Sequence, residues 1–382
     1  MGSEKEKPKR STRNRKPSRR RRSKRVKDDD LDVVLLCNPM AGGRWKELAG
    51  ILDSEEARSV RRIVTDSLED VAPALATLSQ KTALLCIYGG DGTIQRVLDR
   101  LYEDPHAEHP QLAFIGGGTM NVITRWSGLR DTPEGNFRSI VRAFRTGQLL
   151  MKEVPLLHVR QGDTVHHGFT FGVGPAIRVL NMYEKGRKGR LNGAILAVQA
   201  ALATIGRFPT KVRALLEPME AEVIMDGEKL PYGRFSAIFC NSTGRLHIAV
   251  EPFIGSRGRD NFYCAAYAVS LREMALMLPF LARGWLPLDP KALLKPVSTW
   301  KQIAFSYLGK STLPADPRYV NTTAQSFEVH CREDVYTVDG EIFPSNGEPL
   351  CVTVGPTVRL AVSPTVDLGP TMRIAAEISP LR

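Results

Sequence analysis

The feature that most constrains the fold is a regular alternation of apolar runs and amphipathic segments over residues 32–126. The run LDVVLLCNP is rich in β-branched and other apolar residues, which indicates a strand buried on both faces. A helix (WKELAGILD), a strand (SVRRIVT), a helix (LEDVAPALATLSQ), a strand (TALLCIY) and a helix (TIQRVLDRLY) follow. The last stretch, QLAFIGGGTMNVITRW, is a strand that continues through a glycine turn into a helix. This order predicts an α/β domain with a parallel, doubly wound sheet. Ligands of such sheets bind at the carboxyl ends of the strands.

The pattern changes near residue 155, where short alternating strands replace the strand–helix units. They include VPLLHVRQGDTVHHGFTFGVG, AEVIMDGEKLPYGRFSAIFCN, NFYCAAYAVS, QSFEVHCREDVYTVDGEIF and EPLCVTVGPTVRLAV. The Asp-Gly pairs in MDGEK and VDGEI are typical of tight hairpin turns, and helical patches are expected around 191–205 and 271–283. We predict a β-rich, mostly antiparallel domain at 154–363. An α/β domain at 31–153 precedes it, and residues 364–382 are expected to return to that first domain.

The positive charge of the chain is concentrated at its amino end. The 382 residues have a formal net charge of +12, and residues 1–30 hold 14 Lys or Arg against 5 Asp or Glu, a net +9. This segment has no apolar periodicity, so we expect a disordered basic tail. Such a tail can contact anionic lipid headgroups or nucleic acid, or remain solvated without a specific partner. It lacks the apolar core of a secretory signal.

Cysteine and hydropathy patterns indicate a reducing, cytoplasmic setting. The six cysteines are scattered without a CxxC pair, which suits buried free thiols. No apolar run reaches the roughly 18 residues that a transmembrane helix needs. The run MALMLPFLARGWLPL (274–288) suits either an interfacial helix or ordinary core packing.

Three glycine-bearing loops follow predicted strands of the first domain: NPMAGG (38–43), GGDGT (89–93) and GGGTMN (116–121). Glycines at strand ends let the backbone approach a ligand, and the helix N-terminus that follows favours anions. Together the three loops predict a site for nucleotide phosphates. The chain has no GxxxxGK[ST] loop and no GxGxxG after the first strand, which excludes a Walker-type NTPase and a typical dinucleotide dehydrogenase.

Asp91 is an unexpected acid in the middle of a loop that favours phosphate. Its carboxylate repels a polyphosphate unless a cation or a proton lies between them. We therefore expect it to hold Mg²⁺, directly or through water, or to polarise the acceptor hydroxyl. Helix N-capping is the structural alternative.

In this order, NPMAGG, GGDGT, GTMN and the late VDGE resemble the diacylglycerol kinase catalytic-domain superfamily, which includes bacterial soluble lipid kinases, sphingosine kinases and ceramide kinases. The resemblance covers about residues 32–365. It implies two domains with ATP in the cleft between them, Mg²⁺ as cofactor, and transfer of the γ-phosphate to a lipid hydroxyl. It also implies a peripheral location at the inner membrane leaflet. GGDGT alone is shared with NAD kinases.

The resemblance carries over residue by residue. The nucleotide site is expected to contain Asn38, Met40, Ala41, Gly42, Thr65, Gly89, Gly90, Asp91, Gly92, Thr93, Ile94, Gln95, Thr119 and Asn121. Asp339 and Glu341 match the family's DGE element. Glu341 is the expected proton acceptor from the lipid hydroxyl, and Asp91 is the alternative.

Two departures weaken the match locally. The family usually has GTANDFAR, but here GTMNVITR lacks the second acid, at Val122. Where the family has an Asp-Gly pair near a structural Mg²⁺, this chain has Asp260-Asn261. Asp260 is expected to keep the metal contact, with a plain surface turn as the alternative.

The remaining expectations concern partners and competing functions. ATP and a lipid taken from the membrane are the expected partners, a homodimer is left open, and nucleic acid is not expected. The alternatives are a small-molecule kinase similar to NAD kinases, or a non-catalytic adaptor that binds membranes or nucleic acid through the tail. His166 and His167 lie in a hairpin-like segment and are expected to have no catalytic role.

Overall fold

The computed structural model describes residues 32–39, 45–104, 106–118, 122–129, 131–185, 215–244, 253, 258, 260–281, 286–289 and 315–363. The predicted basic tail, the helical patch at 191–205 and the predicted return at 364–382 lie outside these residues.

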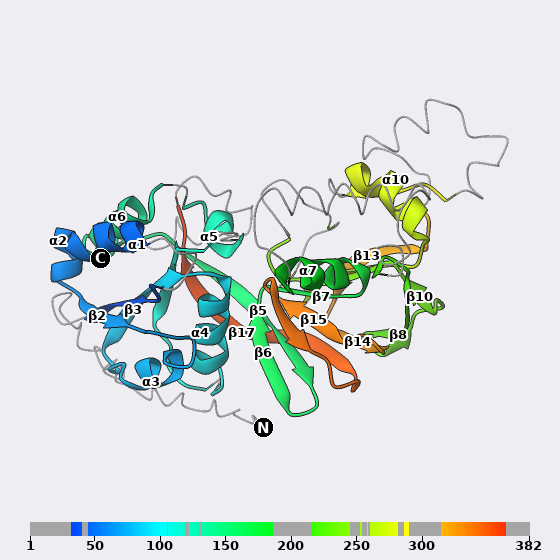
Figure 1. Ribbon diagram of the computed structural model, residues 1–382, viewed down its shortest axis with the longest axis horizontal. Helices are drawn as coiled ribbons and strands as arrows, with labels where there is room; N and C mark the ends of the chain where they lie inside the picture. Colours follow the sequence, from blue (N-terminus) through cyan, green and yellow to red (C-terminus); the bar gives the residue numbers. More distant parts are fainter. Residues whose placement is uncertain are drawn as a thin grey trace, which may run out of the picture.

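The amino-terminal half is a parallel sheet covered by helices on both faces, as the strand–helix alternation predicted (Figure 1). Its strands are ordered β4-β3-β1-β2 and comprise β1 (Asp32–Cys37), β2 (Arg61–Val64), β3 (Thr82–Gly89) and β4 (Gln111–Gly116). Its helices are α1 (Trp45–Asp53), α2 (Glu55–Arg58), α3 (Val71–Ala76), α4 (Asp91–Leu101), α5 (Val122–Trp126) and α6 (Pro133–Arg145). All pairings among the four strands are parallel.

Two apolar clusters lie on opposite faces of this sheet. Val34 and Leu36 of β1 belong to one cluster, with Ile94 of α4. Leu35 of β1 belongs to the other, with Phe137 of α6. Successive side chains of a strand point to opposite faces, so a continuous apolar run is what a strand buried on both sides requires.

The second half is β-rich and mostly antiparallel, as predicted. Its strands are β5 (Met151–Gln161), β6 (Thr164–Gly168), β7 (Thr170–Val173), β8 (Met219–Met225), β9 (Glu228–Lys229), β10 (Arg234–Phe235), β11 (Ala237–Asn241), β12 (Phe262–Tyr267), β13 (Tyr319–Ala324), β14 (Ser326–Cys331), β15 (Val335–Val338), β16 (Glu341–Pro344) and β17 (Leu350–Ala361). Its described helices are α7 (Pro175–Lys185) and α10 (Leu271–Leu281). One sheet has the order β13-β12-β11-β7-β15-β16, and a shared apolar cluster joins it to β8, β14 and β17.

Both Asp-Gly pairs form the turns of antiparallel hairpins, as predicted. Asp226 and Gly227 connect β8 to β9 with φ of 50° and 84°. Asp339 and Gly340 connect β15 to β16 with φ of 52° and 91°. Two consecutive residues with positive φ define the type I′ geometry, which matches the twist of the flanking strands.

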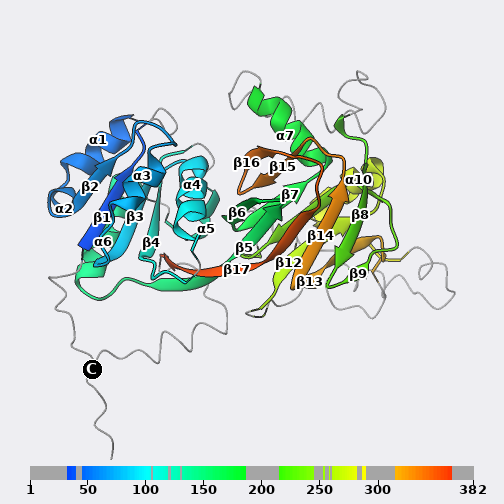
Figure 2. The ribbon, with the colours of Figure 1, turned by 90° about the horizontal axis from the view of Figure 1, so that it is seen from below.

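Strand β17 connects the two halves. It pairs antiparallel with β5 from Leu350 to Ala361, and Leu360 also pairs with Leu112 of β4 in parallel. The parallel sheet therefore continues into strands of the second half, and Figure 2 shows β17 crossing between them. Val358 and Leu360 lie in the core of the first half. The exact domain limits, including the boundary at residue 153, stay a prediction.

Candidate functional site

The glycine loops after β1, β3 and β4 meet at one edge of the parallel sheet. Cys37 of β1 is in register with Tyr88 of β3, and Gly89 of β3 with Gly116 of β4. Hydrogen bonds continue past the strand ends: Asn38 N–H donates to the Tyr88 carbonyl at 2.9 Å, and Gly117 N–H donates to the Gly89 carbonyl at 2.9 Å. The described parts of the three loops are therefore adjacent, as the sequence predicted for a ligand edge.

Asn38 and Thr65 are fixed at this edge by buried hydrogen bonds. The Asn38 amide donates to Thr93 Oγ1 at 3.0 Å, which ties the end of β1 to the first turn of α4. Thr65 follows β2, and its N–H and Oγ1 both donate to the Cys37 carbonyl, at 2.9 and 3.2 Å. Both side chains are at least 95% buried. They hold neighbouring strand ends together beside the GGDGT loop.

The GGDGT loop turns tightly into α4. A Cβ on Gly89 would lie 2.6 Å from Cβ of Thr93, so only glycine fits there without movement. Gly90 is the N-cap residue, with extended backbone, and Asp91 is the first residue of the helix. Asp91 is therefore not the N-cap, and the capping alternative is wrong. Asp91 thus stands in the first turn, at the positive end of the helix dipole.

The hairpin β15–β16 brings Glu341 to the same helix N-terminus. A Cβ built on Gly92 would lie 2.9 Å from Oε1 and 3.1 Å from Oε2 of Glu341. Glu341 is the first residue of β16, and its carbonyl accepts a hydrogen bond of 2.8 Å from Thr337 Oγ1. The VDGE and GGDGT motifs thus come together from the two halves of the chain.

Both carboxylate oxygens of Asp339 accept hydrogen bonds from backbone N–H groups. Its Oδ1 accepts the N–H groups of Phe169 and Thr170 at 3.0 and 2.8 Å, and its Oδ2 lies 3.0 Å from the Phe169 nitrogen. Burial raises the pKa of Asp339 to about 7, against the lowering effect of these backbone hydrogen bonds. The nearby negative charges of Asp91 and Asp99 add to the rise. Asp339 therefore fixes the hairpin that carries Glu341.

The other predicted site residues fall into three groups. The side chain of Ile94 packs in the apolar core, so any nucleotide contact would have to come from its backbone. The Gln95 amide donates to Asp99 Oδ1 at 3.0 Å and to the His167 carbonyl at 2.9 Å. The remaining predicted residues lie outside the described part of the chain: Met40, Ala41, Gly42, Thr119 and Asn121.

Asp260 is exposed in a bend two residues before β12. Within the described residues, no three His, Cys, Asp or Glu side chains form a group that could hold a metal ion. Asp260 therefore belongs to no such group within the described residues, and its metal role stays a prediction.

Sequence reasoning missed a polar network behind the nucleotide loop. Asp99, two turns along α4 from Asp91, accepts from the His167 N–H at 2.7 Å with Oδ1, and its Oδ2 lies 2.8 Å from His166 Nδ1. The His166 ring stacks on Phe343 of β16, with centroids 3.8 Å apart. The helix that carries GGDGT is thereby connected through β6 to the strand that carries Glu341.

A second histidine contact extends this network. Nδ1 of His158 on β5 lies 3.1 Å from Nε2 of His167. Burial, aided by the neighbouring His158, lowers the pKa of His167 to about 4, so its ring is neutral at physiological pH. The only sequence signal for the network was the paired His166-His167, whose partners are distant in sequence.

Comparisons with known proteins concern the family and the fold of the chain. Residues 32–150 match the family model of the diacylglycerol kinase catalytic domain. This match confirms the predicted resemblance to the diacylglycerol kinase catalytic-domain superfamily over these residues, about a third of the chain. No curated protein matches the sequence.

Solved structures share the fold at low sequence identity. A candidate diacylglycerol kinase from Bacillus anthracis str. Sterne is 16% identical, with a TM-score of 0.58, and the match covers 88% of this chain and 98% of that one. Another structure of a diacylglycerol kinase from the same organism is 15% identical, with a TM-score of 0.53 and the same coverage. At this identity the likeness establishes the two-part fold alone. None of the described helices is both long and apolar enough to span a bilayer.

Proposed function

We propose that this chain is an ATP-dependent lipid kinase that transfers the γ-phosphate to a hydroxyl of diacylglycerol, a sphingoid base, ceramide or a related lipid. The observation that carries the proposal is the contact between the Glu341 carboxylate and Gly92 at the N-terminus of α4. It brings an acid to a helix N-terminus suited to phosphate. The family match over residues 32–150 supports a kinase.

The site offers the elements that phosphoryl transfer requires. Such transfer depends mainly on positioning and on neutralising the charge of the phosphates. The N–H groups of the first turn of α4 attract the phosphates, and the glycines allow their close approach. Glu341 accepts the proton of the lipid hydroxyl as the new O–P bond forms and the bond from the γ-phosphorus to the bridging oxygen of ADP breaks, releasing ADP. This role requires Glu341 to lie within hydrogen-bond reach of that hydroxyl.

Glu341 is a better candidate for the base than Asp339. The carboxylate oxygens of Asp339 are occupied by the N–H groups of Phe169 and Thr170, and the side chain is buried. Glu341 is only partly buried and lies at the helix N-terminus. Asp91 stays the alternative base.

Mg²⁺ fits the donor set if ATP supplies part of its coordination. Magnesium prefers oxygen ligands and is usually held by one or two carboxylates together with substrate phosphates. Asp91, at the start of α4, would hold it, directly or through water. The ion would neutralise charge on the phosphates.

The lipid substrate and its origin in the membrane are also proposed. The lipid is expected to be taken from the membrane by a peripherally associated protein, with ATP bound in the cleft between the domains. Residues 40–42, Thr119 and Asn121 are expected to complete the nucleotide site. A small-molecule kinase similar to NAD kinases and a non-catalytic adaptor that binds through the basic tail stay the alternatives.

The direct test is transfer of labelled phosphate from [γ-³²P]ATP in the presence of Mg²⁺. Diacylglycerol, sphingosine and ceramide in mixed micelles should be offered in parallel, with NAD as a non-lipid acceptor. The proposal expects a labelled lipid from at least one lipid and none from NAD. Labelled NADP with no labelled lipid, or no product at all, would contradict it.

A further inference from the structure

A pocket of about 330 Å³ lies in the first half of the molecule, at the edge of the parallel sheet opposite the candidate kinase site. Thr82, the first residue of β3, and Pro110, just before β4, are part of its lining. The rest comes from the end of α3 with the loop after it, the end of α4, and the loop before β4. The pocket is therefore separate from the strand ends that carry the glycine loops.

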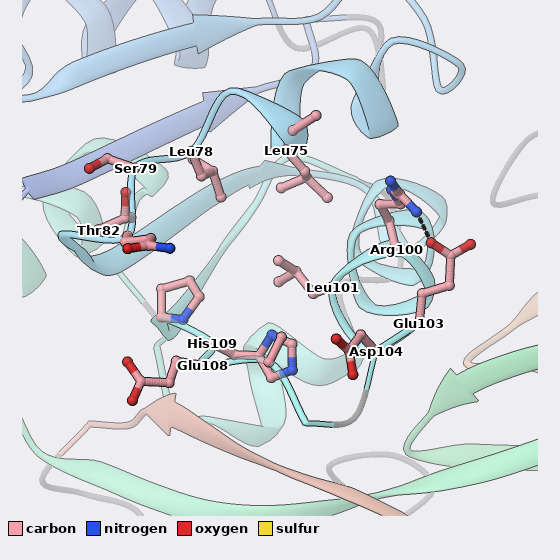
Figure 3. A pocket seen from close by; sticks show the side chains of 14 residues that line it. Leu75, Leu78, Ser79, Thr82, Arg100, Leu101, Glu103, Asp104, Glu108 and His109 are labelled. Carbon is pink, nitrogen blue, oxygen red and sulfur yellow. Dashed lines mark ion pairs between the residues drawn. The ribbon is translucent and has the colours of Figure 1, made fainter.

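The pocket combines an apolar interior with an acidic rim. Figure 3 shows Leu75, Leu78 and Leu101 pointing into it. The lining also includes Glu103, Asp104 and Glu108, all exposed. Arg100 is the one cationic Lys or Arg side chain of the lining, and it already pairs with Glu103. This combination suits an aliphatic stem with a cationic head, as in lysine and arginine.

Two polar atoms of the lining residues are buried without a hydrogen-bond partner: Oγ1 of Thr82 and Nε2 of His109. Thr82 is 8% exposed. Burial lowers the pKa of His109, against a smaller raising effect of the Asp104 backbone, and a neutral imidazole nitrogen can accept a hydrogen bond. Unpartnered buried polar atoms are rare in folded proteins. Both atoms belong to residues of the pocket lining and have no partner within the described protein.

The first described residue, which follows the basic amino-terminal segment in the sequence, lies beside this pocket. Asp32, where β1 begins, is in register with Thr82, and its N–H donates to the Lys81 carbonyl at 3.3 Å. Residues 19–27, RRRRSKRVK, contain seven Lys or Arg. Lys27 precedes Asp32 by five residues, a reach of up to roughly 17 Å in an extended chain. A short tether holds such a segment near its site at an effective concentration on the order of millimolar.

We propose that residues 19–27 dock on this pocket, with one Lys or Arg side chain inserted over the leucines and its charge held at the rim of Glu103, Asp104 and Glu108. The occupant is thus the chain's own basic segment. The docking does not depend on the kinase reaction, because the pocket and the glycine loops lie at opposite edges of the sheet.

Limited trypsin digestion of the full chain tests the docking, since trypsin cleaves after Lys and Arg. The variant Glu103→Gln/Glu108→Gln removes two rim charges without adding a cleavage site. Its matched control, Asp53→Asn/Glu55→Gln, removes two exposed carboxylates on the other face of the sheet. We expect the rim variant to be cut within residues 19–27 about fivefold faster than the wild type at low salt. Each exposed ion pair between the segment and the rim contributes modestly to the free energy of docking, and the variant loses two of them.

The control variant should be cut at the wild-type rate, and high salt should bring all three proteins to the fast rate. Carbodiimide cross-linking of the wild type should join Lys24 or Lys27 to Glu103, Asp104 or Glu108. Equal cleavage rates in all three proteins at low salt would overturn the proposal. So would protection that appears only after adding anionic phospholipid vesicles or duplex DNA, which would assign the segment to those partners.

Discussion

The carboxylate of Glu341 lies against Gly92, so close that a Cβ at Gly92 would come within 2.9 Å of Oε1. Gly92 belongs to the first turn of α4 in the parallel-sheet half, and Glu341 begins β16 in the β-rich half. This contact joins the two motifs on which the proposed kinase reaction depends.

Replacing Gly92 with alanine should impair the reaction more than the fold. The three atoms nearest the added Cβ all belong to the end of the flexible Glu341 side chain, which would move away from the helix N-terminus. Alanine is also the better helix former, by about 1 kcal/mol. We expect Gly92→Ala to lower kcat at least about tenfold, which corresponds to about 1.4 kcal/mol of lost transition-state stabilisation, while urea unfolding stays close to that of the wild type.

Gly233→Ala is the matched control for this change, because nothing lies within 4 Å of a Cβ at Gly233. It should leave kcat unchanged. Wild-type kcat in Gly92→Ala would show that the position of Glu341 against the helix does not matter for turnover.

The network around Asp99 should contribute to stability and to the position of α4. Removing its carboxylate in Asp99→Ala leaves the His167 N–H and the His166 ring nitrogen without their partner. Losing one side of such partly buried hydrogen bonds costs about 2–3 kcal/mol. Asp99→Asn, which keeps the shape and one acceptor oxygen, should recover part of the loss.

Urea unfolding measures this effect, and Asp163→Ala, at the exposed turn between β5 and β6, is the control. If the network also positions α4, kcat should fall in Asp99→Ala and partly recover in Asp99→Asn. Equal stability of Asp99→Ala and Asp163→Ala would contradict the structural role of the network.

The raised pKa of Asp339 predicts a specific dependence of stability on pH. The folded protein keeps the proton up to about pH 7, whereas the unfolded chain releases it near 3.8. Between these values the folded state binds more protons, so the contribution of Asp339 to stability falls as pH rises. Asp339→Asn removes this titration and retains an acceptor for the Phe169 and Thr170 N–H groups.

Urea unfolding of wild type and Asp339→Asn at several pH values between 4 and 7.5 checks this prediction. The free energy of unfolding of the variant, relative to the wild type, should increase with pH over this range, on the order of a few kcal/mol. The same pH slope in both proteins would show that Asp339 titrates at its ordinary pKa.

Local sequence signals were enough to predict the fold class. The apolar runs from LDVVLLC to QLAFIG form parallel strands because each is buried on both faces. Asp226-Gly227 and Asp339-Gly340 form hairpin turns because their backbone angles are set by the two residues themselves. The apolar runs and the Asp-Gly pairs are local signals, because each lies within the strand or the turn that it specifies.

Long-range relationships could not be predicted in the same way. Asp99 and His166 are 67 residues apart, and an aspartate within a helix followed much later by a histidine pair carries no local signal. The crossing of β17 into the first half likewise depends on its pairing with β5 and β4. The motif resemblance identified Glu341 and Asp91, but only the fold shows that Asp339 is occupied by backbone donors.

The most direct test of the account is kcat of Glu341→Gln for transfer of the γ-phosphate to the preferred lipid. A general base typically contributes about 10²- to 10⁴-fold, so kcat should fall by about that factor while KM for ATP changes little. Glu328→Gln, on β14 away from the helix N-terminus, should keep wild-type turnover. Undiminished kcat in Glu341→Gln would contradict the assignment of the proton acceptor.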